Sequence, residues 1–413
     1  MSVEQDLEEL LQQPNSLPVL FVGSGLSLRY LKAPTWAALL ERFAADAGRP
    51  MPYYRGKAGD DLPAVASLLA EDFFEQWFTK RKYQHSRREQ QASVRQRADP
   101  LKFEIAKYLR TLRPVKKADM VAEVKALKSV RVHSVITTNW DTFLEESLPH
   151  LEVFVGQQDI LFAQTQAIGE IYKIHGSVTD PSSMVLTAED YEDYWAKNPY
   201  LIAKMLTMFV EHPVIFLGYS LTDPHIQRLL GNLIACLTAS QVQVLNDRLV
   251  FVRRPRTPNE VESLNNAPLT IHGHSVNARE VVLSDFGLLY KVLNGLPQRF
   301  DVSLIRRLKH DVYELAFNTP PTGTVHVVDI EDDTDLDKVQ VVIGVGIMAR
   351  LGEKGYAQYD RWDVFRDMLK GSRQHDVKML TEVLLPEIFK GAKYAPICYP
   401  LYRLFPVPGE RCR

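Results

Sequence analysis

Two polar residues, Asn139 and His175, follow apolar segments at positions where an enzyme could place catalytic side chains. Imidazole titrates near neutral pH, so His175 could act as a general base at the end of its predicted strand. Asn139 and Asp141 could contact a ligand, because open α/β sheets bind ligands at the carboxyl ends of their strands. Both patterns also have a structural interpretation, since Asn and Asp cap helices and most single histidines are not catalytic.

A glycine-containing turn, residues 23–27 with the sequence GSGLS, follows the apolar segment Val19 to Val22. The apolar segment predicts a buried strand of a parallel sheet, and Ala37 to Phe43 has helical spacing. Glycines let a backbone approach a ligand closely and adopt positive φ angles. Strand, glycine turn and helix together predict N–H groups that face a phosphate. The third glycine of the usual dinucleotide fingerprint is missing, so an ordinary turn also explains the pattern.

The composition is that of an ordinary soluble globular protein. The chain has 413 residues, 46% of them hydrophobic and 24% charged, and a net charge of −2. This length predicts two domains or three, and the charge gives no field that attracts nucleic acid or an anionic membrane. The three cysteines argue against a disulfide framework and exclude a four-cysteine zinc site. Without a membrane-spanning segment or a signal peptide pattern, we expect a cytoplasmic location.

The order of predicted elements indicates one α/β domain over residues 1–297. Its apolar, β-rich segments lie at 19–22, 132–138, 168–174, 214–217, 248–252 and 279–283. Residues 253–268 have the composition of a polar, proline-containing connection. Residues from about 52 to 115 predict a helical insertion. Its basic stretch at 80–97 indicates either an anion-binding surface or a solvated helix.

Residues 298–413 predict a second, smaller region. They have helical patterns around one candidate strand at 339–345, so we expect an α+β or mostly helical fold. A proline-containing segment at 319–323 and an acidic segment at 329–337 are typical of surface loops.

Four motifs follow one another at the ends of predicted strands. They are Gly23-Ser24-Gly25-Leu26-Ser27, Thr138-Asn139-Trp140-Asp141, Lys173-Ile174-His175-Gly176 and Gly218-Tyr219-Ser220-Leu221. In this order they resemble the sirtuin family, whose NAD pocket uses Gly-Ala-Gly-x-Ser, Thr-Gln-Asn-x-Asp, His-Gly and Gly-x-Ser-Leu. The chain is most similar to the sirtuin-like NADase domains of bacterial anti-phage defence systems, in which proline and tryptophan follow the first loop, as Pro34 and Trp36 do here. The resemblance covers roughly the first 290 residues.

The resemblance implies a sirtuin-like, Rossmann-type parallel sheet with a set of site residues. Asn139 would position the nicotinamide ribose and a water molecule, and His175 would be the general base. The residues implied to bind NAD are Gly23, Ser24, Gly25 and Ser27 at the diphosphate, Thr138 at the ribose, Asp141 at the nicotinamide amide, and Gly218 and Ser220 on the adenosine side.

Two departures from the sirtuin pattern bear on the substrate. Family deacetylases carry a four-cysteine zinc module between the His-Gly and Gly-x-Ser motifs, but no cysteine lies between His175 and Gly218. We therefore expect a fold that lacks the zinc module and holds no metal, and the usual acyl-lysine cleft is no longer implied. Thr138 also replaces the family's glutamine.

These features predict an NAD glycohydrolase that cleaves its substrate NAD to nicotinamide and ADP-ribose. Nicotinamide would leave through an oxocarbenium-like transition state that needs electrostatic stabilisation, and Asn139 and His175 would orient and deprotonate the attacking water. Unrestrained NAD hydrolysis would kill the host, so we expect the effector of an abortive-infection system. We expect residues 298–413 to be regulatory or to bind a defence partner protein. Family analogy implies a homo-oligomer, with nucleic acid contacted only through a partner.

Two other functions stay open from the sequence. A protein deacylase or ADP-ribosyltransferase would need a peptide groove beside His175. A non-catalytic sensor of NAD or ADP-ribose would need neither Asn139 nor His175, so the presence of both residues argues against it.

Overall fold

The computed structural model describes residues 2–297, with gaps at 13–15, 162, 164–166, 220–223, 247 and 272–273, and residues 302, 305, 306 and 309. The chain divides into two compact units, Met1–Gly323 and Thr324–Arg413. The second unit, like the helices and the strand predicted after residue 310, lies outside the described residues. None of the helices within the described ranges is long and apolar enough to cross a membrane.

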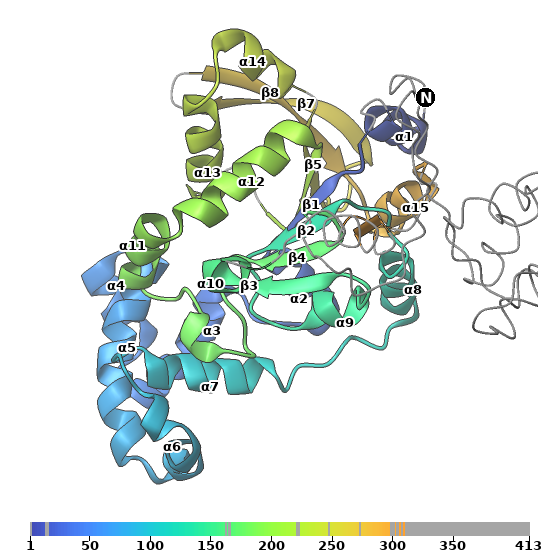
Figure 1. Cartoon of the computed structure of the whole chain (residues 1–413). Coiled ribbons are helices and arrows are strands. Elements are labelled where there is room, and N and C mark those ends of the chain that lie inside the picture. The colour runs from blue at the N-terminus through green and yellow to red at the C-terminus, as the bar shows by residue number, and fades with distance from the viewer. Residues whose placement is uncertain are drawn as a thin grey trace, which may run out of the picture. The chain divides into compact units, whose positions relative to one another are not determined.

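Eight strands in the described part of the chain form one sheet (Figure 1). Their order is β3-β4-β2-β1-β5-β6-β8-β7, and neighbouring strands are parallel except β7 and β8. The strands are β1 (Val19–Val22), β2 (Ser134–Thr137), β3 (Glu152–Val155), β4 (Glu170–Lys173), β5 (Val214–Leu217), β6 (Leu249–Arg253), β7 (Ser263–Ile271) and β8 (His274–Val282). The predicted α/β class with a mostly parallel sheet is confirmed.

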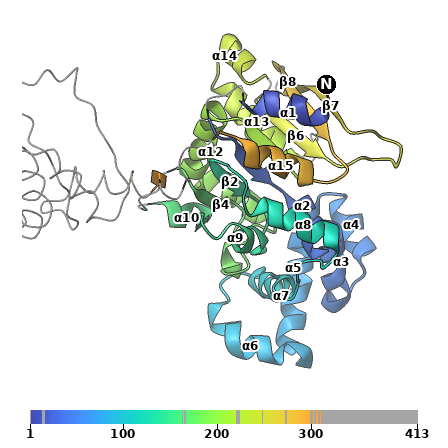
Figure 2. The same ribbon diagram turned by 90° about the vertical axis from the view of Figure 1, so that its right-hand side faces the viewer.

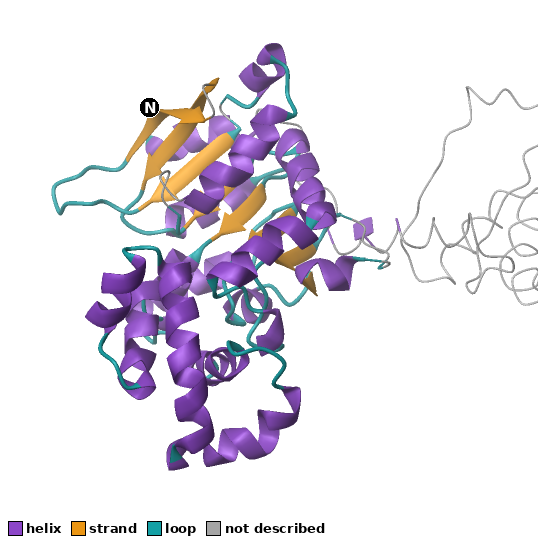
Figure 3. Cartoon of the chain, turned by 90° about the vertical axis from the view of Figure 1, so that its left-hand side faces the viewer, coloured by secondary structure: helices purple, strands orange, loops and turns teal. Residues whose placement is uncertain are grey.

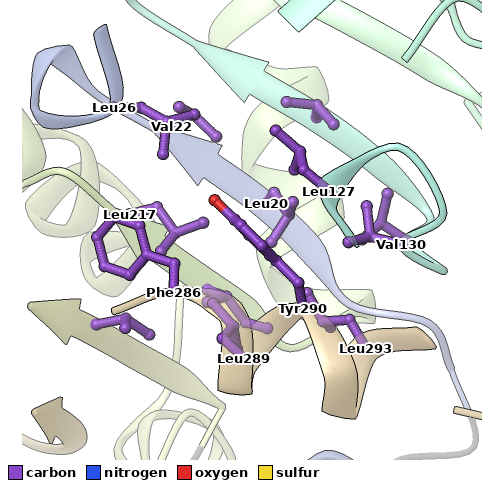
Figure 4. Close-up of a cluster of buried hydrophobic side chains, with 14 of the residues drawn as sticks. Leu20, Val22, Leu26, Leu127, Val130, Leu217, Phe286, Leu289, Tyr290 and Leu293 are labelled. Carbon is purple, nitrogen blue, oxygen red and sulfur yellow. The ribbon is translucent and has the colours of Figure 1, made fainter. Parts of the chain in front are cut away.

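Helices cover both faces of the sheet (Figures 1 and 2). One core contains Leu20 and Val22 of β1, and the other contains Val19 and Phe21, because successive strand residues point to opposite faces. The first core is covered by α1 (Val3–Gln12), α2 (Ser24–Leu31), α8 (Ala118–Leu127), α9 (Phe143–Ser147) and α15 (Gly287–Gly295). The second is covered by α10 (Gly156–Ile160), α12 (Pro199–Glu211), α13 (Pro224–Ala235) and α14 (Ala239–Val244). Figure 4 shows Leu289 and Tyr290 of α15 beside Leu20 of β1.

A helical insertion with its own core lies between α2 and β2 (Figure 3). It consists of α3 (Trp36–Ala47), α4 (Met51–Ala58), α5 (Leu62–Thr79), α6 (Gln84–Gln90), α7 (Asp99–Leu109) and two single turns of 3-10 helix. Several residues of the basic stretch contact the insertion itself: Lys82 pairs with Asp46, and Arg97 pairs with Glu71. These contacts favour the interpretation of the stretch as a solvated helical surface.

The two edge strands of the sheet differ from the sequence-based expectations. β7 includes residues 263–268, the last part of the segment expected to be a polar connection, and β3 was not predicted at all. An edge strand has fewer buried positions than a central one, so its apolar pattern is weak. Phe154 is the only buried residue of β3, and Pro268 in β7 is of a type tolerated at sheet edges.

The backbones of α2 and β5 are in direct contact at two glycines. A Cβ atom on Gly25 would lie 2.6 Å from the Cα atom of Gly218, and the N–H of Gly25 donates to the carbonyl of Gly218 at 3.3 Å. The positive φ expected in the first glycine turn occurs instead at Gly218, at +75°. Gly23 has a φ of −108° and caps α2, which begins at Ser24, so the expected loop is the start of a helix.

A buried ion pair joins α2 to two other helices. Arg29 of α2 donates to the carboxylate of Glu123 in α8 through Nε at 2.9 Å and through Nη2, and the two side chains are 6% and 5% exposed. The Tyr30 hydroxyl donates to the same carboxylate at 2.6 Å and lies 3.2 Å from the hydroxyl of Tyr290 in α15. A buried charge needs its partner, so Glu123 fixes α2 relative to α8 and α15.

Replacing Glu123 with leucine should destabilise the protein, because it leaves the Arg29 guanidinium buried without a counter-charge. Removing one partner of a buried pair costs roughly 3 to 5 kcal/mol, and the variant's thermal unfolding midpoint should fall accordingly. Asp119→Ala is the control on the same helix, since Asp119 pairs with an exposed lysine and its loss should barely move the midpoint. Equal midpoints for both variants would contradict the assigned role of Glu123.

Gly25→Ala should also lower the unfolding midpoint, because the added methyl group meets backbone atoms of Gly218 that cannot rotate away. Overpacking of this kind typically costs about 1 to 3 kcal/mol. The matched control is Gly56→Ala in α4, where a Cβ meets nothing within 4 Å. Alanine is the better helix former, so that variant should be more stable by about 0.5 to 1 kcal/mol. Thermal unfolding of both variants distinguishes a local packing constraint at Gly25 from a general intolerance of alanine.

Candidate functional site

The carboxyl ends of β4, β2, β1 and β5 lie side by side, because these strands are adjacent and parallel (Figure 1). Gly23 follows β1, Thr138 follows β2, Gly218 follows β5, and His175 lies two residues beyond β4. β1 has β2 on one side and β5 on the other, so the direction of the strand order reverses here. Parallel sheets bind ligands at such switch points.

Hydrogen bonds connect the first and second motifs. The side-chain amide of Asn139 donates from Nδ2 to the carbonyl of Gly23 at 3.0 Å, and the Ser27 hydroxyl donates to Asp141 Oδ2 at 2.6 Å. Asp141 Oδ1 accepts the backbone N–H of Phe143, the first residue of α9, at 3.1 Å, although the N-cap position of this helix is occupied by Thr142. Asn139 and Asp141 are buried, and their side-chain positions are therefore defined by these partners.

Tyr219 lies across the end of β1, although the sequence analysis assigned it no role. Its hydroxyl hydrogen-bonds to the Thr138 hydroxyl, and its ring centroid lies 5.3 Å from that of Phe21. A Cβ atom on Gly23 would lie 2.6 Å from the tyrosine ring, so this packing requires glycine there. The feature of the sequence that could have indicated this role is the large aromatic residue that directly follows Gly218. Ser220, the next residue of that motif, lies outside the described residues.

His175 is buried beside two tyrosines from one helix, α11 (Ala188–Lys197). The ring centroids of Tyr191 and Tyr194 lie 5.4 and 5.0 Å from that of His175, with interplanar angles of 88° and 82°. Burial raises the pKa of the Tyr194 hydroxyl, so this tyrosine stays neutral. The two rings limit the orientations open to the imidazole.

The loop after β4 folds back over the histidine. The carbonyl of His175 accepts hydrogen bonds from Trp140 Nε1 and from the N–H of Val185, both at 3.0 Å. The turn is possible because Gly176 has a φ of +87°, and a Cβ atom there would overlap the backbone of Ser183 at 2.2 Å. The loop thereby connects the third motif to the second through Trp140.

Lys173, the last residue of β4, contacts the backbone of the second motif, a role that the sequence analysis missed. Its buried Nζ donates to the carbonyl of Asp141 and to Glu145 Oε1, each at 2.5 Å. Burial raises the pKa of the Glu145 carboxyl above its ordinary value, and the charge of Lys173 opposes that rise. The available signal was a lysine at the end of an otherwise apolar strand.

The structure thus brings every described member of the predicted site to one edge of the sheet. Ser24, the exposed first residue of α2, lies at a helix N-terminus, where partial positive charge favours phosphate. Gly23 and Gly25 make room beside this position for the Tyr219 ring and the Gly218 backbone. Asn139 and His175 supply an amide and an imidazole beyond the ends of β2 and β4. These donor types fit a dinucleotide. Among the described residues, no group of three or more His, Cys, Asp or Glu side chains could hold a metal ion.

Comparison with known proteins finds similarity over part of this chain. Residues 133–272, roughly a third of the chain, match the family model of the SIR2-like domain. The NAD(+) hydrolase ThsA of Bacillus cereus (strain MSX-D12) is 24% identical over 200 residues, which cover 46% of this chain and 41% of that protein. The NAD(+) hydrolase ThsA of Enterococcus faecium is 29% identical over 114 residues, which cover 26% and 24% of the two chains.

A third relative, the Defense-associated sirtuin 2 of Bacillus subtilis, is 28% identical over 104 residues, which cover 24% of this chain and 10% of that protein. The matched segments span less than half the length of each of these relatives. The order of the motifs and the topology of the sheet agree with the match to the family model. Residues 133–272 of this chain are therefore similar to the SIR2-like domain.

Proposed function

We propose that this protein is an NAD glycohydrolase that cleaves NAD to nicotinamide and ADP-ribose. The proposal rests on the convergence of Asn139, His175 and the first turn of α2 at one switch point of the sheet. Similarity to two proteins named NAD(+) hydrolase ThsA supports this choice of substrate and reaction.

The proposed roles follow from the position of each residue. The diphosphate of NAD binds at Ser24 and Gly25, where the dipole of α2 favours negative charge. Asp141 accepts a hydrogen bond from the nicotinamide amide, which its carboxylate can do while it keeps Ser27, because each oxygen has two lone pairs. Asn139 holds the nicotinamide ribose and a water molecule.

In the reaction, the bond between the nicotinamide nitrogen and the ribose breaks, and its electron pair leaves with nicotinamide. Positive charge develops on the ribose, and fixed dipoles in a buried site stabilise such charge better than water does. The water held by Asn139 adds to the ribose carbon, and His175 accepts its proton. The products are nicotinamide and ADP-ribose.

We also propose that this activity serves anti-phage defence, because one similar protein is named a defense-associated sirtuin. Depletion of NAD would end the infected cell together with the phage, as in abortive infection. Such an enzyme needs a restraint, and we assign that restraint to a partner protein, a trigger or assembly into a homo-oligomer, acting through residues 298–413.

The test measures total NAD in cells that express the wild-type protein or a variant, before and after phage infection. Wild type should lose NAD and accumulate free ADP-ribose, whereas Asn139→Ala and His175→Ala should slow the loss at least about a hundredfold, the scale expected for general-base catalysis. NAD and ADP-ribose are quantified by liquid chromatography and mass spectrometry.

Two exposed residues provide matched controls for this experiment. His85 in α6 is largely exposed, with 74% of its side chain in solvent, and Asn265 lies on the exposed side of β7. His85→Ala and Asn265→Ala should therefore deplete NAD as wild type does. Unchanged NAD in infected wild-type cells, across several phages, would rule out the hydrolase. ADP-ribose found attached to protein would instead identify a transferase.

A further inference from the structure

The histidine proposed as general base takes its orientation from α11, and α11 is held by the helical insertion. Tyr191 and Tyr194 are three residues apart on this helix, and both pack edge-on against His175. Any shift of α11 therefore moves both rings that confine the imidazole. What fixes α11 also positions the histidine.

A buried ion pair crosses from the insertion to the start of α11. Lys102 of α7 donates from Nζ to Asp190 Oδ1 at 2.7 Å, and the lysine side chain is only 2% exposed. The other carboxylate oxygen of Asp190 accepts the N–H groups of Leu186 and Thr187, both at 2.9 Å, and so caps the helix. A buried lysine without its carboxylate would be costly, which ties the position of α7 to that of α11.

A second insertion helix contacts the same turn. The hydroxyl of Ser67 in α5 accepts the N–H of Ala188 at 3.0 Å and donates to Glu189 at 2.7 Å. A cavity of about 530 Å³ lies beside the ion pair, and its lining includes Lys102, Asp190 and Tyr194. The ring of Trp36 in α3 also lies 6.0 Å from that of Tyr191, so polar and aromatic contacts together connect the insertion to α11.

We propose that Lys102 and Asp190 are positioning residues for His175, so that the helical insertion acts on the reaction through α11. Neither residue touches the sheet edge where NAD is proposed to bind. The expected effect on kcat rests on the proposed hydrolase function. The expected effect on the orientation of His175 does not. It gives the insertion a role that its own core and its basic surface do not explain.

The kinetic test compares Lys102→Met and Asp190→Asn with the wild-type full-length protein. Displacement of a catalytic group by a fraction of an ångström to about 1 Å costs roughly ten- to a hundredfold in rate, so kcat for NAD hydrolysis should fall by that factor. KM should stay within about twofold, because the contacts of Asn139 and Gly23 are unchanged. Lys102→Arg, which keeps the charge, should recover part of kcat.

A spectroscopic test does not depend on activity. The protein is labelled at histidine Cε1, and the His175 resonance is assigned by its absence in His175→Ala, among the eleven histidines of the chain. Ring currents from Tyr191 and Tyr194 set its chemical shift, so Lys102→Met should move it at constant pH. Asp190→Asn keeps one oxygen that can accept the capping N–H groups of Leu186 and Thr187 but loses the charge that pairs with Lys102. It provides the same readout if Lys102→Met does not fold.

The control is Arg97→Ala, which removes the ion pair between Arg97, two residues before α7, and Glu71 of α5. The two side chains are 70% and 59% exposed. It should change neither kcat nor the His175 resonance. An unchanged resonance in folded Lys102→Met and Asp190→Asn would overturn the proposal, as would equal changes of kcat and KM. If the wild type does not hydrolyse NAD but the resonance moves, the hydrolase function fails and the positioning role stands.

Discussion

The direct backbone contact between Gly25 and Gly218 sets the geometry on which the other residues of the site depend. It places the first turn of α2 directly on the end of β5, without any side chain in between. Asn139 and Asp141 then reach α2 from β2, one through the Gly23 carbonyl and one through the Ser27 hydroxyl. A wider spacing between α2 and β5 would move α2 away from the end of β2 and lengthen each of these hydrogen bonds. The absence of a side chain at Gly25 and Gly218 therefore allows the close approach of α2 and β5 at this edge of the sheet.

Residue pattern predicted the central strands of the fold, whereas the site residues came from the resemblance to sirtuins and stay a prediction. The central strands are continuous apolar segments buried on both faces, a strong signal, and each ends in a motif whose position follows from parallel strand geometry. The edge strands β3 and β7 were not predicted, because one-sided burial leaves them with mixed polar and apolar residues. The local sequence could not predict β3 and β7, since these segments are extended because they pair with β4 and β8.

The roles of Lys173 and Tyr219 illustrate a different limit. Both belong to motifs recognised in the sequence, yet their partners, Glu145 and Thr138, lie far away along the chain. Spacing gives no information on such pairs. The same holds for Lys102 and Asp190, which belong to separate helical patterns and meet only when the insertion packs against the segment after β4. Long-range polar pairs of this kind connect the sheet's two-sided core to the separate core of the insertion.

The position of β1 between β2 and β5 also has a consequence for the order in which the protein matures. Residues of the site come from the beginning of the chain and from as far along as Gly218, just past its middle. A nascent chain emerges from the ribosome at its amino end, and contacts between distant segments form late. Until β5 leaves the ribosome, Gly25 has no backbone partner and the switch point is open on one side. The strand ends that surround β1 therefore come together only after residues beyond β5 have been synthesised.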